Sequence, residues 1–141
     1  MAIPQGQNAP EIELPEGSPD NLIALSEFRG EPVVLLFFPL AFTSVCTDEM
    51  CSVSADLNAY EKLGARVFGI SVDSPFTQNA WKEAEGIDLP LLSDFNREAV
   101  RAFEVNRDEL LGLRQVANRS AFVIDAEGVV RYSWESEDPR V

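Results

Sequence analysis

The amino-acid sequence predicts an α/β fold in which helices flank a central mixed β-sheet. An unbroken apolar run at residues 33–38, stopped by Pro39, is typical of a buried central strand. From Cys46 onward, apolar residues recur at alternating spacings of four and three, the period of one helix face. A further apolar stretch, residues 66–72, follows as a second strand. Strand, helix and strand of these lengths form a right-handed unit with parallel strands.

The segments around this unit carry clear signals for where elements begin and end. Residues 1–20 contain four of the nine prolines, which predicts an extended arm with one short strand at residues 11–14. The helix that carries Cys46 is expected to end near Gly64. Ser74 and Pro75 provide an N-cap and a proline at the first helical position, which predicts a helix that runs to about Gly86.

Shorter elements are predicted after this helix. Residues 89–92 are interpreted as a short strand and residues 96–103 as a short helix. Residues 104–118 give mixed signals, and we interpret them as a loop with room for one helical turn at residues 108–112.

The final predicted elements form an antiparallel hairpin. Its strands are residues 120–125 and 129–134, joined by a turn that contains Gly128. A parallel unit first, a hairpin last and a cysteine at the start of the first helix are the layout of a thioredoxin-like fold. A plain thioredoxin-type oxidoreductase would have its cysteines closer together than the five positions that separate Cys46 from Cys51.

Length and composition indicate one ordinary hydrophobic core, so residues 1–141 are expected to form a single domain. The 24 acidic residues exceed the 11 basic ones, which gives a net charge of −13. Such a field repels nucleic-acid phosphates and anionic membranes, so neither is an expected partner. No apolar run reaches membrane-spanning length, and the first residues lack a basic segment followed by an apolar one. We therefore expect a cytoplasmic location.

Cysteine usage directs attention to one site. Two cysteines are too few for a secreted disulfide framework, and in a reducing compartment such a pair is more often catalytic or metal-binding. The chain has no histidine, the commonest metal ligand. Since a structural zinc site takes four ligands, we expect no metal and no bound organic cofactor.

Cys46 has a position that favours a reactive thiol. It lies where a strand passes into a helix, so unpaired backbone amides at the helix start can stabilise a thiolate. Thr43, three residues earlier, offers a hydroxyl that can cap the helix or hold a polar substrate oxygen. In the alternative interpretation, Cys46 is a small buried apolar residue and Thr43 is only the N-cap.

The segment around this cysteine resembles the active-site signature of the peroxiredoxin family. Residues 39–46, PLAFTSVC, match its order of proline, three residues, threonine or serine, two residues and cysteine. The similarity extends to residues 37–38, 47–49, 89–94 and 118–125, so it covers most of the chain. The residues of the first motif are similar to those of the alkyl hydroperoxide reductase E branch. The second cysteine, five positions on, follows the bacterioferritin-comigratory, or Q-type, branch.

The resemblance implies a thiol-dependent peroxidase for hydrogen peroxide and organic hydroperoxides. Cys46 would be the nucleophile that becomes a sulfenic acid, Thr43 would contact the peroxide, and Pro39 would shield the sulfenic acid from water. Arg119 would stabilise the thiolate and donate to the peroxide oxygens, and Glu49 would orient Arg119. The implied partners are a thioredoxin-like or other dithiol reductant and, as a homodimer, a second copy.

Cys51 would resolve the sulfenic acid as an intramolecular disulfide. In an intact helix the two Cα atoms are about 8.6 Å apart, whereas a disulfide needs about 4.4–6.8 Å. At least the first helical turn must therefore unwind on oxidation. In the alternative, Cys51 is passive and an external thiol resolves Cys46.

Other interpretations compete with these assignments. In one, Arg119 is only a surface residue. In another, Glu49 is an ordinary acidic residue in the first turn of the helix. Trp81 is interpreted as core packing. At the level of function, the alternative is a peroxide sensor or thiol relay that oxidises a partner protein. A third hypothesis is a thioredoxin-like binding module with inert cysteines.

The acidity has two explanations, an ordinary solvated surface or adaptation to high salt. If it is a salt adaptation, molar KCl should raise the melting temperature, because salt screens repulsion among the 24 carboxylates. Thermal melts at low and high KCl measure this. Maximal stability without added salt would leave ordinary solubility as the explanation.

Overall fold

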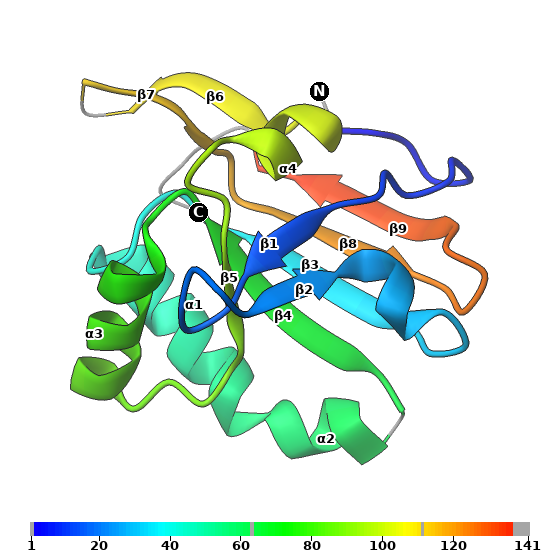
Figure 1. Ribbon diagram of the computed structural model, residues 1–141, viewed down its shortest axis with the longest axis horizontal. Coiled ribbons are helices and arrows are strands. Elements are labelled where there is room, and N and C mark those ends of the chain that lie inside the picture. Colours follow the sequence, from blue (N-terminus) through cyan, green and yellow to red (C-terminus); the bar gives the residue numbers. More distant parts are fainter. Residues whose placement is uncertain (1, 63, 111, 137–141) are drawn as a thin grey trace.

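A five-stranded mixed sheet forms the centre of the computed structural model, which describes residues 2–62, 64–110 and 112–136 (Figure 1). Its strand order is β5-β4-β3-β8-β9. Strands β3, β4 and β5 are parallel, β8 is antiparallel to β3, and β9 is antiparallel to β8. The strands are β3 (Val33–Phe37), β4 (Arg66–Ser71), β5 (Leu91–Ser93), β8 (Ser120–Ile124) and β9 (Val130–Glu135). The mixed sheet, its parallel unit and its terminal hairpin confirm the sequence prediction.

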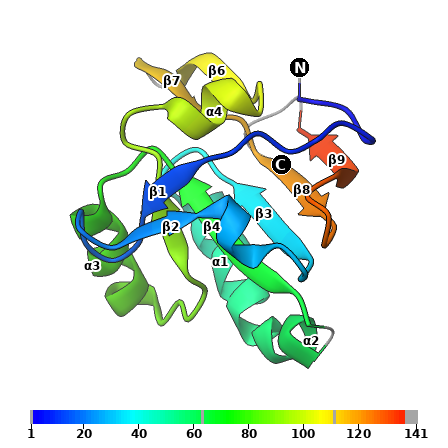
Figure 2. The same ribbon diagram turned by 45° about the vertical axis from the view of Figure 1, so that its right-hand side comes forward.

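Two hydrophobic clusters cover the two faces of this sheet. On one face, helices α1 (Ser44–Ala55) and α3 (Pro75–Glu85) contribute Met50 and Trp81, which pack with Val67 and Leu91. The other face is covered by the hairpin of β1 (Glu13–Pro15) and β2 (Leu22–Ala24), by the 3-10 helix η1 (Leu25–Phe28) and by helix α4 (Glu98–Ala102). Figure 2 shows α1 and the β1–β2 hairpin on opposite sides of the sheet.

Local sequence determines where α3 begins and ends. The Ser74 hydroxyl accepts a hydrogen bond from the Thr77 backbone amide at 3.2 Å, and Pro75 occupies the first turn. Gly86 ends the helix at φ 67°, a left-handed conformation that glycine adopts without steric cost. Both boundaries of this helix are confirmed.

Several predicted elements differ in their bounds; the short strand expected at residues 89–92, for example, is β5 at Leu91–Ser93. The single helix expected from Cys46 to Gly64 begins at Ser44 and is interrupted at Asp56, after which α2 (Leu57–Lys62) follows. The short strand expected at residues 11–14 is β1, whose partner β2 was not predicted. Helix α4 is shorter than residues 96–103.

The prediction of a loop at residues 104–118 is wrong. This segment contains β6 (Asn106–Leu110) and β7 (Leu113–Ala117), which pair as an antiparallel hairpin with Asn106 opposite Ala117. Most of its side chains are charged or polar and partly exposed, so the apolar alternation that marks a half-buried strand is weak. Backbone pairing rather than burial defines this hairpin.

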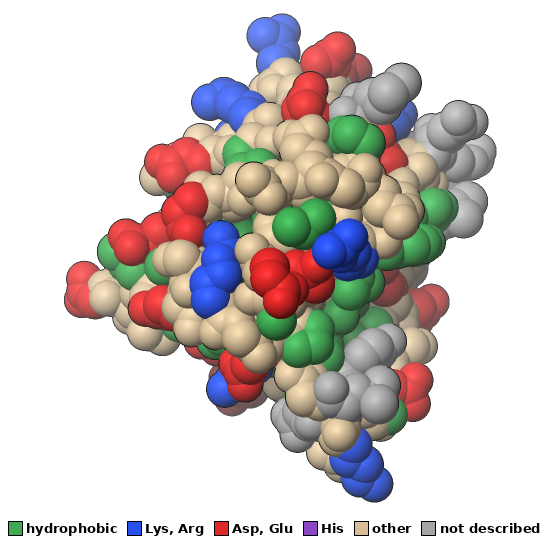
Figure 3. All heavy atoms as spheres, turned by 90° about the vertical axis from the view of Figure 1, so that its right-hand side faces the viewer, with side chains coloured by type: hydrophobic (Ala, Val, Ile, Leu, Met, Phe, Trp, Pro, Cys, Tyr) green, Lys and Arg blue, Asp and Glu red, His purple; other side chains and the backbone are tan. Residues whose placement is uncertain are grey.

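Strand β9 is an edge of the main sheet and exposes two large side chains, Tyr132 and Trp134. Figure 3, which views the molecule from the right-hand side of Figure 1, shows apolar side chains at the surface between acidic and basic ones. Across residues 2–62, 64–110 and 112–136, no helix has the length and apolar character needed to cross a membrane.

Candidate active site at the start of helix α1

Cys46 is the third residue of α1, directly after the loop that leaves the carboxyl end of β3. Its side chain is only 1% exposed and packs in the cluster beneath α1 and α3. The first backbone amides of α1, at residues 44–46, have no acceptor within the helix. A negative charge on Cys46 Sγ therefore lies at the end of the helix that favours it.

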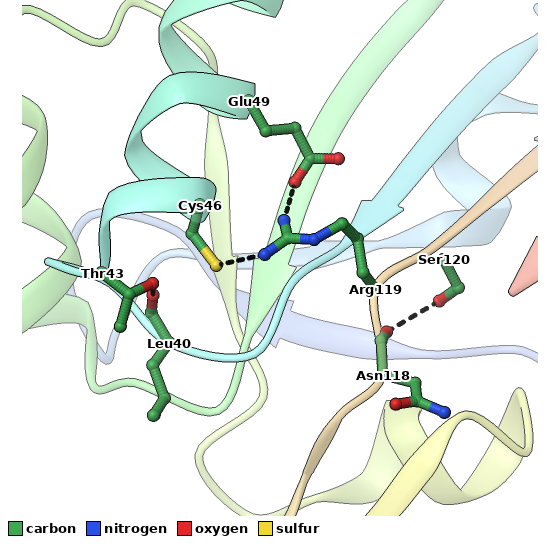
Figure 4. A network of polar contacts seen from close by, with 7 residues as sticks. All are labelled: Leu40, Thr43, Cys46, Glu49, Asn118, Arg119 and Ser120. Carbon is green, nitrogen blue, oxygen red and sulfur yellow. Dashed lines mark hydrogen bonds and ion pairs between the residues drawn. The ribbon is translucent and has the colours of Figure 1, made fainter. Parts of the chain in front are cut away.

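Arg119 brings a positive charge to this sulfur. It immediately precedes β8, and Ser120 pairs with Phe37 at the end of β3. The sheet register thus places Arg119 beside the loop that leads to Cys46. Its side chain is 5% exposed, and its Nη2 donates to Cys46 Sγ at 2.9 Å (Figure 4). A short, charge-assisted contact of this kind places a fixed positive charge directly against the sulfur.

Glu49 holds the other side of the same guanidinium. It lies nearly one turn after Cys46, and its Oε1 accepts from Arg119 Nη1 in an ion pair. Burial raises the pKa of Glu49 above its usual value of 4.5, while the charge of Arg119 and its hydrogen bond lower it in part. Arg119 Nε is also buried and has no acceptor among the described residues.

Thr43 and Arg119 lie on either side of the Cys46 sulfur (Figure 4). Thr43 occupies the N-cap position of α1 but makes no side-chain cap; its hydroxyl instead donates to the Leu40 carbonyl at 2.8 Å. Because that bond uses the hydroxyl proton, the lone pairs of the oxygen remain available to accept. Pro39 is buried at the beginning of this loop.

Cys51 is separated from the other five predicted site residues. Both cysteines are free thiols, but Cys51 is partly exposed and lies within 3.7 Å of the Glu85 carbonyl at the end of α3, to which its thiol donates. The structure therefore brings together Cys46, Arg119 and Glu49 by direct contacts, with Thr43 and Pro39 in the adjoining loop. Cys51 instead contacts the Glu85 carbonyl.

Two supporting contacts were not predicted from the sequence. Trp81 is fully buried, which confirms its interpretation as core packing, and its indole N–H also donates to Thr47 Oγ1 in α1 at 3.0 Å. The backbone carbonyl of Arg119 accepts from the Ser136 amide at 2.8 Å. The two residues in each bond lie far apart in the sequence, so no local sequence pattern reveals either bond.

The loop that carries Thr43 contains a strained residue. Phe42 has φ 66°, a left-handed conformation that is unfavourable for a bulky side chain. Such backbone strain costs about 1–3 kcal/mol and persists only where surrounding contacts impose it. The side chain of Phe42 is 56% exposed, so burial of the ring does not account for the conformation.

The described ranges of the chain contain no group of three or more cysteine, aspartate or glutamate side chains placed to hold a metal ion.

Comparisons with known proteins agree with the resemblance seen in the sequence. Residues 5–133 match the AhpC/TSA family. Peroxiredoxin-2 of Rattus norvegicus is 40% identical over 116 residues, which cover 77% of this chain and 57% of that protein. The chain thus spans little more than half the length of this curated relative.

Two solved structures superpose closely on the chain. The reduced 2-Cys peroxiredoxin of Plasmodium vivax gives a TM-score of 0.83 at 31% identity, with 94% of this chain and 85% of that chain covered. Peroxidoxin BcpB from Mycobacterium tuberculosis gives 0.84 at 33% identity, with 95% and 86% covered. These likenesses confirm the predicted thioredoxin-like fold.

Replacing Glu49 by glutamine should change how stability depends on pH. Because the pKa of Glu49 is raised in the folded protein, its stabilising contribution is full below its unfolded value of about 4.5 and is lost as pH rises through the folded value. The free energy of unfolding of wild type minus that of Glu49→Gln should therefore fall as pH rises from about 4 to about 7. Urea denaturation at a series of pH values measures this difference.

Glu83→Gln, on the exposed side of α3, is the control for removing one negative charge. A difference that grows in favour of wild type as pH rises would contradict the expectation. It would mean that the attraction of Arg119 outweighs the burial of Glu49.

Proposed function

Because the chain belongs to the AhpC/TSA family, we propose that it is a thiol-dependent peroxidase that reduces hydrogen peroxide and organic hydroperoxides at Cys46. The observation that carries the proposal is the 2.9 Å contact between Arg119 Nη2 and Cys46 Sγ. A fixed cation at a buried sulfur serves little purpose for an inert thiol, but it stabilises the thiolate on which nucleophilic attack depends.

The reaction begins when the Cys46 thiolate attacks one oxygen of the peroxide. A sulfur–oxygen bond forms and the O–O bond breaks, so the sulfur is oxidised to a sulfenic acid and the peroxide is reduced by two electrons. The second oxygen leaves as hydroxide or alkoxide and takes up a proton to become water or an alcohol. The site must therefore stabilise charge that passes from sulfur to oxygen.

The residues around Cys46 suit this transfer. Arg119 is held by Glu49 with its guanidinium beside the sulfur, and its buried Nε–H provides a further donor toward oxygen. The Thr43 hydroxyl, oriented by its bond to Leu40, accepts from a protonated peroxide oxygen. The amides at the start of α1 donate to the developing charge. Buried Pro39 limits the access of water to the sulfenic acid.

We assign Cys51 the role of resolving thiol. Its thiolate attacks the sulfenic sulfur, a disulfide forms, and the oxygen leaves as water after taking up a proton. The helical separation of about 8.6 Å between the Cα atoms exceeds disulfide range. The start of α1 must unwind, with loss of the Trp81–Thr47 and Cys51–Glu85 hydrogen bonds.

The proposal extends to the partners that turnover requires. A thioredoxin-like or other dithiol reductant would reduce the disulfide by thiol–disulfide exchange. A homodimer and a cytoplasmic location belong to the same proposal, the latter because two cysteines suit a reducing compartment rather than a secreted framework.

Peroxide consumption by matched variants tests the function. With a thioredoxin system supplied, wild type should turn over continuously and Cys46→Ser should consume no peroxide. Cys51→Ser should stop after about one equivalent unless an external thiol is added. Consumption by Cys46→Ser at the wild-type rate would exclude Cys46 as the nucleophile. One equivalent consumed by wild type, followed by a stable mixed disulfide, would indicate a sensor or thiol relay instead.

Mass spectrometry after one equivalent of peroxide tests the role of Cys51. Wild type should lose the mass of two hydrogen atoms, which marks an internal disulfide. Fluorescence adds a second readout, because Trp81 should lose its bond to Thr47, and Trp134→Phe removes the only other tryptophan. A persistent sulfenic acid or an intermolecular dimer, unchanged in Cys51→Ser, would make this a one-cysteine enzyme.

A further inference from the structure

We infer that Asp73 is a positioning residue of the Cys46 site, because its carboxylate anchors the loop of residues 39–43 from outside that loop. The inference rests on the proposed peroxidase function. Asp73 follows β4, and its Oδ2 accepts a hydrogen bond from the Ala41 backbone amide at 2.8 Å. Ala41 immediately precedes the strained Phe42.

The anchor itself is held in place by the sheet. Ser71 Oγ donates to the same carboxylate oxygen at 2.7 Å, and the backbone carbonyl of Asp73 accepts from Ser93 Oγ in β5 at 2.6 Å. Ser71 Oγ in turn accepts from Gln78 Nε2, which is buried in α3, at 2.9 Å. The Asp73 carboxylate is therefore held in place relative to β4, β5 and α3 by contacts that do not involve the loop.

This arrangement explains how the loop keeps a conformation that its own residues disfavour. Phe42 is left-handed and largely exposed, so contacts from outside the loop, its ring contact with Trp81 and the bond to Asp73, must oppose its relaxation. The bond from the Ala41 amide to Asp73 lies one residue before the strain. Thr43, at the start of α1, follows one residue after it, and its hydroxyl donates to the Leu40 carbonyl just before Ala41, so the anchor holds the segment that orients the Thr43 hydroxyl.

Loss of the anchor should impair peroxide binding and leave the activation of sulfur intact. The Arg119–Cys46 contact joins the residue before β8 to α1 and does not pass through Asp73. Peroxide attack needs the sulfur, the Thr43 hydroxyl and the helix amides in one geometry. Alkylation of Cys46 by iodoacetamide needs the thiolate but not that geometry.

The test compares these two rates in wild type, Asp73→Ala and Asp73→Asn under single-turnover conditions. Asp73→Ala should react with hydrogen peroxide about ten- to a hundredfold more slowly than wild type, while Cys46 alkylation stays within about threefold. Asp73→Asn keeps an oxygen that accepts from Ala41, so most of the peroxide rate should return. Asp88→Ala, an exposed loop aspartate, is the control and should match wild type.

Four results would overturn the inference. Equal peroxide rates for Asp73→Ala and wild type would show that the anchor does not matter, and the peroxidase function would stand. A parallel loss of alkylation would indicate a general structural role. Asp73→Asn as slow as Asp73→Ala would show that hydrogen-bond acceptance is not the cause. Absence of peroxide reaction in wild type would remove the proposed function and the inference together.

Discussion

The contact between the Arg119 guanidinium and the Cys46 sulfur is the interaction on which the site depends. A buried guanidinium is costly unless charge or hydrogen-bonding partners compensate it. Here Nη2 meets the sulfur and Nη1 meets Glu49. The fold delivers these groups from distant parts of the chain, since the antiparallel register of β8 on β3 sets Arg119 beside the start of α1. A shift of that register by one residue would turn Arg119 to the opposite face of the sheet.

In the proposed mechanism, helix α1 must be held firmly while the thiol is reduced and must open when the disulfide forms. Helix α1 is tied to α3 and the loop after it by Thr47 with Trp81, by Cys51 with the Glu85 carbonyl, and by Ser54, whose hydroxyl accepts from two backbone amides. These bonds keep Cys46 in register with Arg119 while the thiol is reduced. A disulfide between Cys46 and Cys51 requires the first two to break. Under the proposed mechanism, the reduced geometry serves peroxide attack, and the free energy lost with these two bonds is compensated only when the S–S bond forms.

Much of the sheet was predictable because buried strands are visible in the sequence as apolar runs. The apolar runs of β3 and β4 and the Ser74-Pro75 start of α3 are local signals, and the structure confirms them. The β6–β7 hairpin escaped prediction because its polar side chains carry no burial signal. The candidate site residues came from motif resemblance rather than periodicity, since no spacing rule links Arg119 to Cys46 across 73 positions. Asp73 was missed for a related reason. Its carboxylate accepts from the Ala41 backbone amide, so no side chain in the loop marks the contact in the sequence.

The most direct measurement of the central claim is the rate at which iodoacetamide alkylates Cys46 at neutral pH in wild type and in Arg119→Gln. A hydrogen bond to a charged group is worth enough that its loss should slow Cys46 alkylation at least about tenfold. Alkylation of Cys51, which has a different partner, is the internal control and should not change. Equal Cys46 rates in the two proteins would contradict the account, because they would show that the guanidinium contact does not stabilise the thiolate.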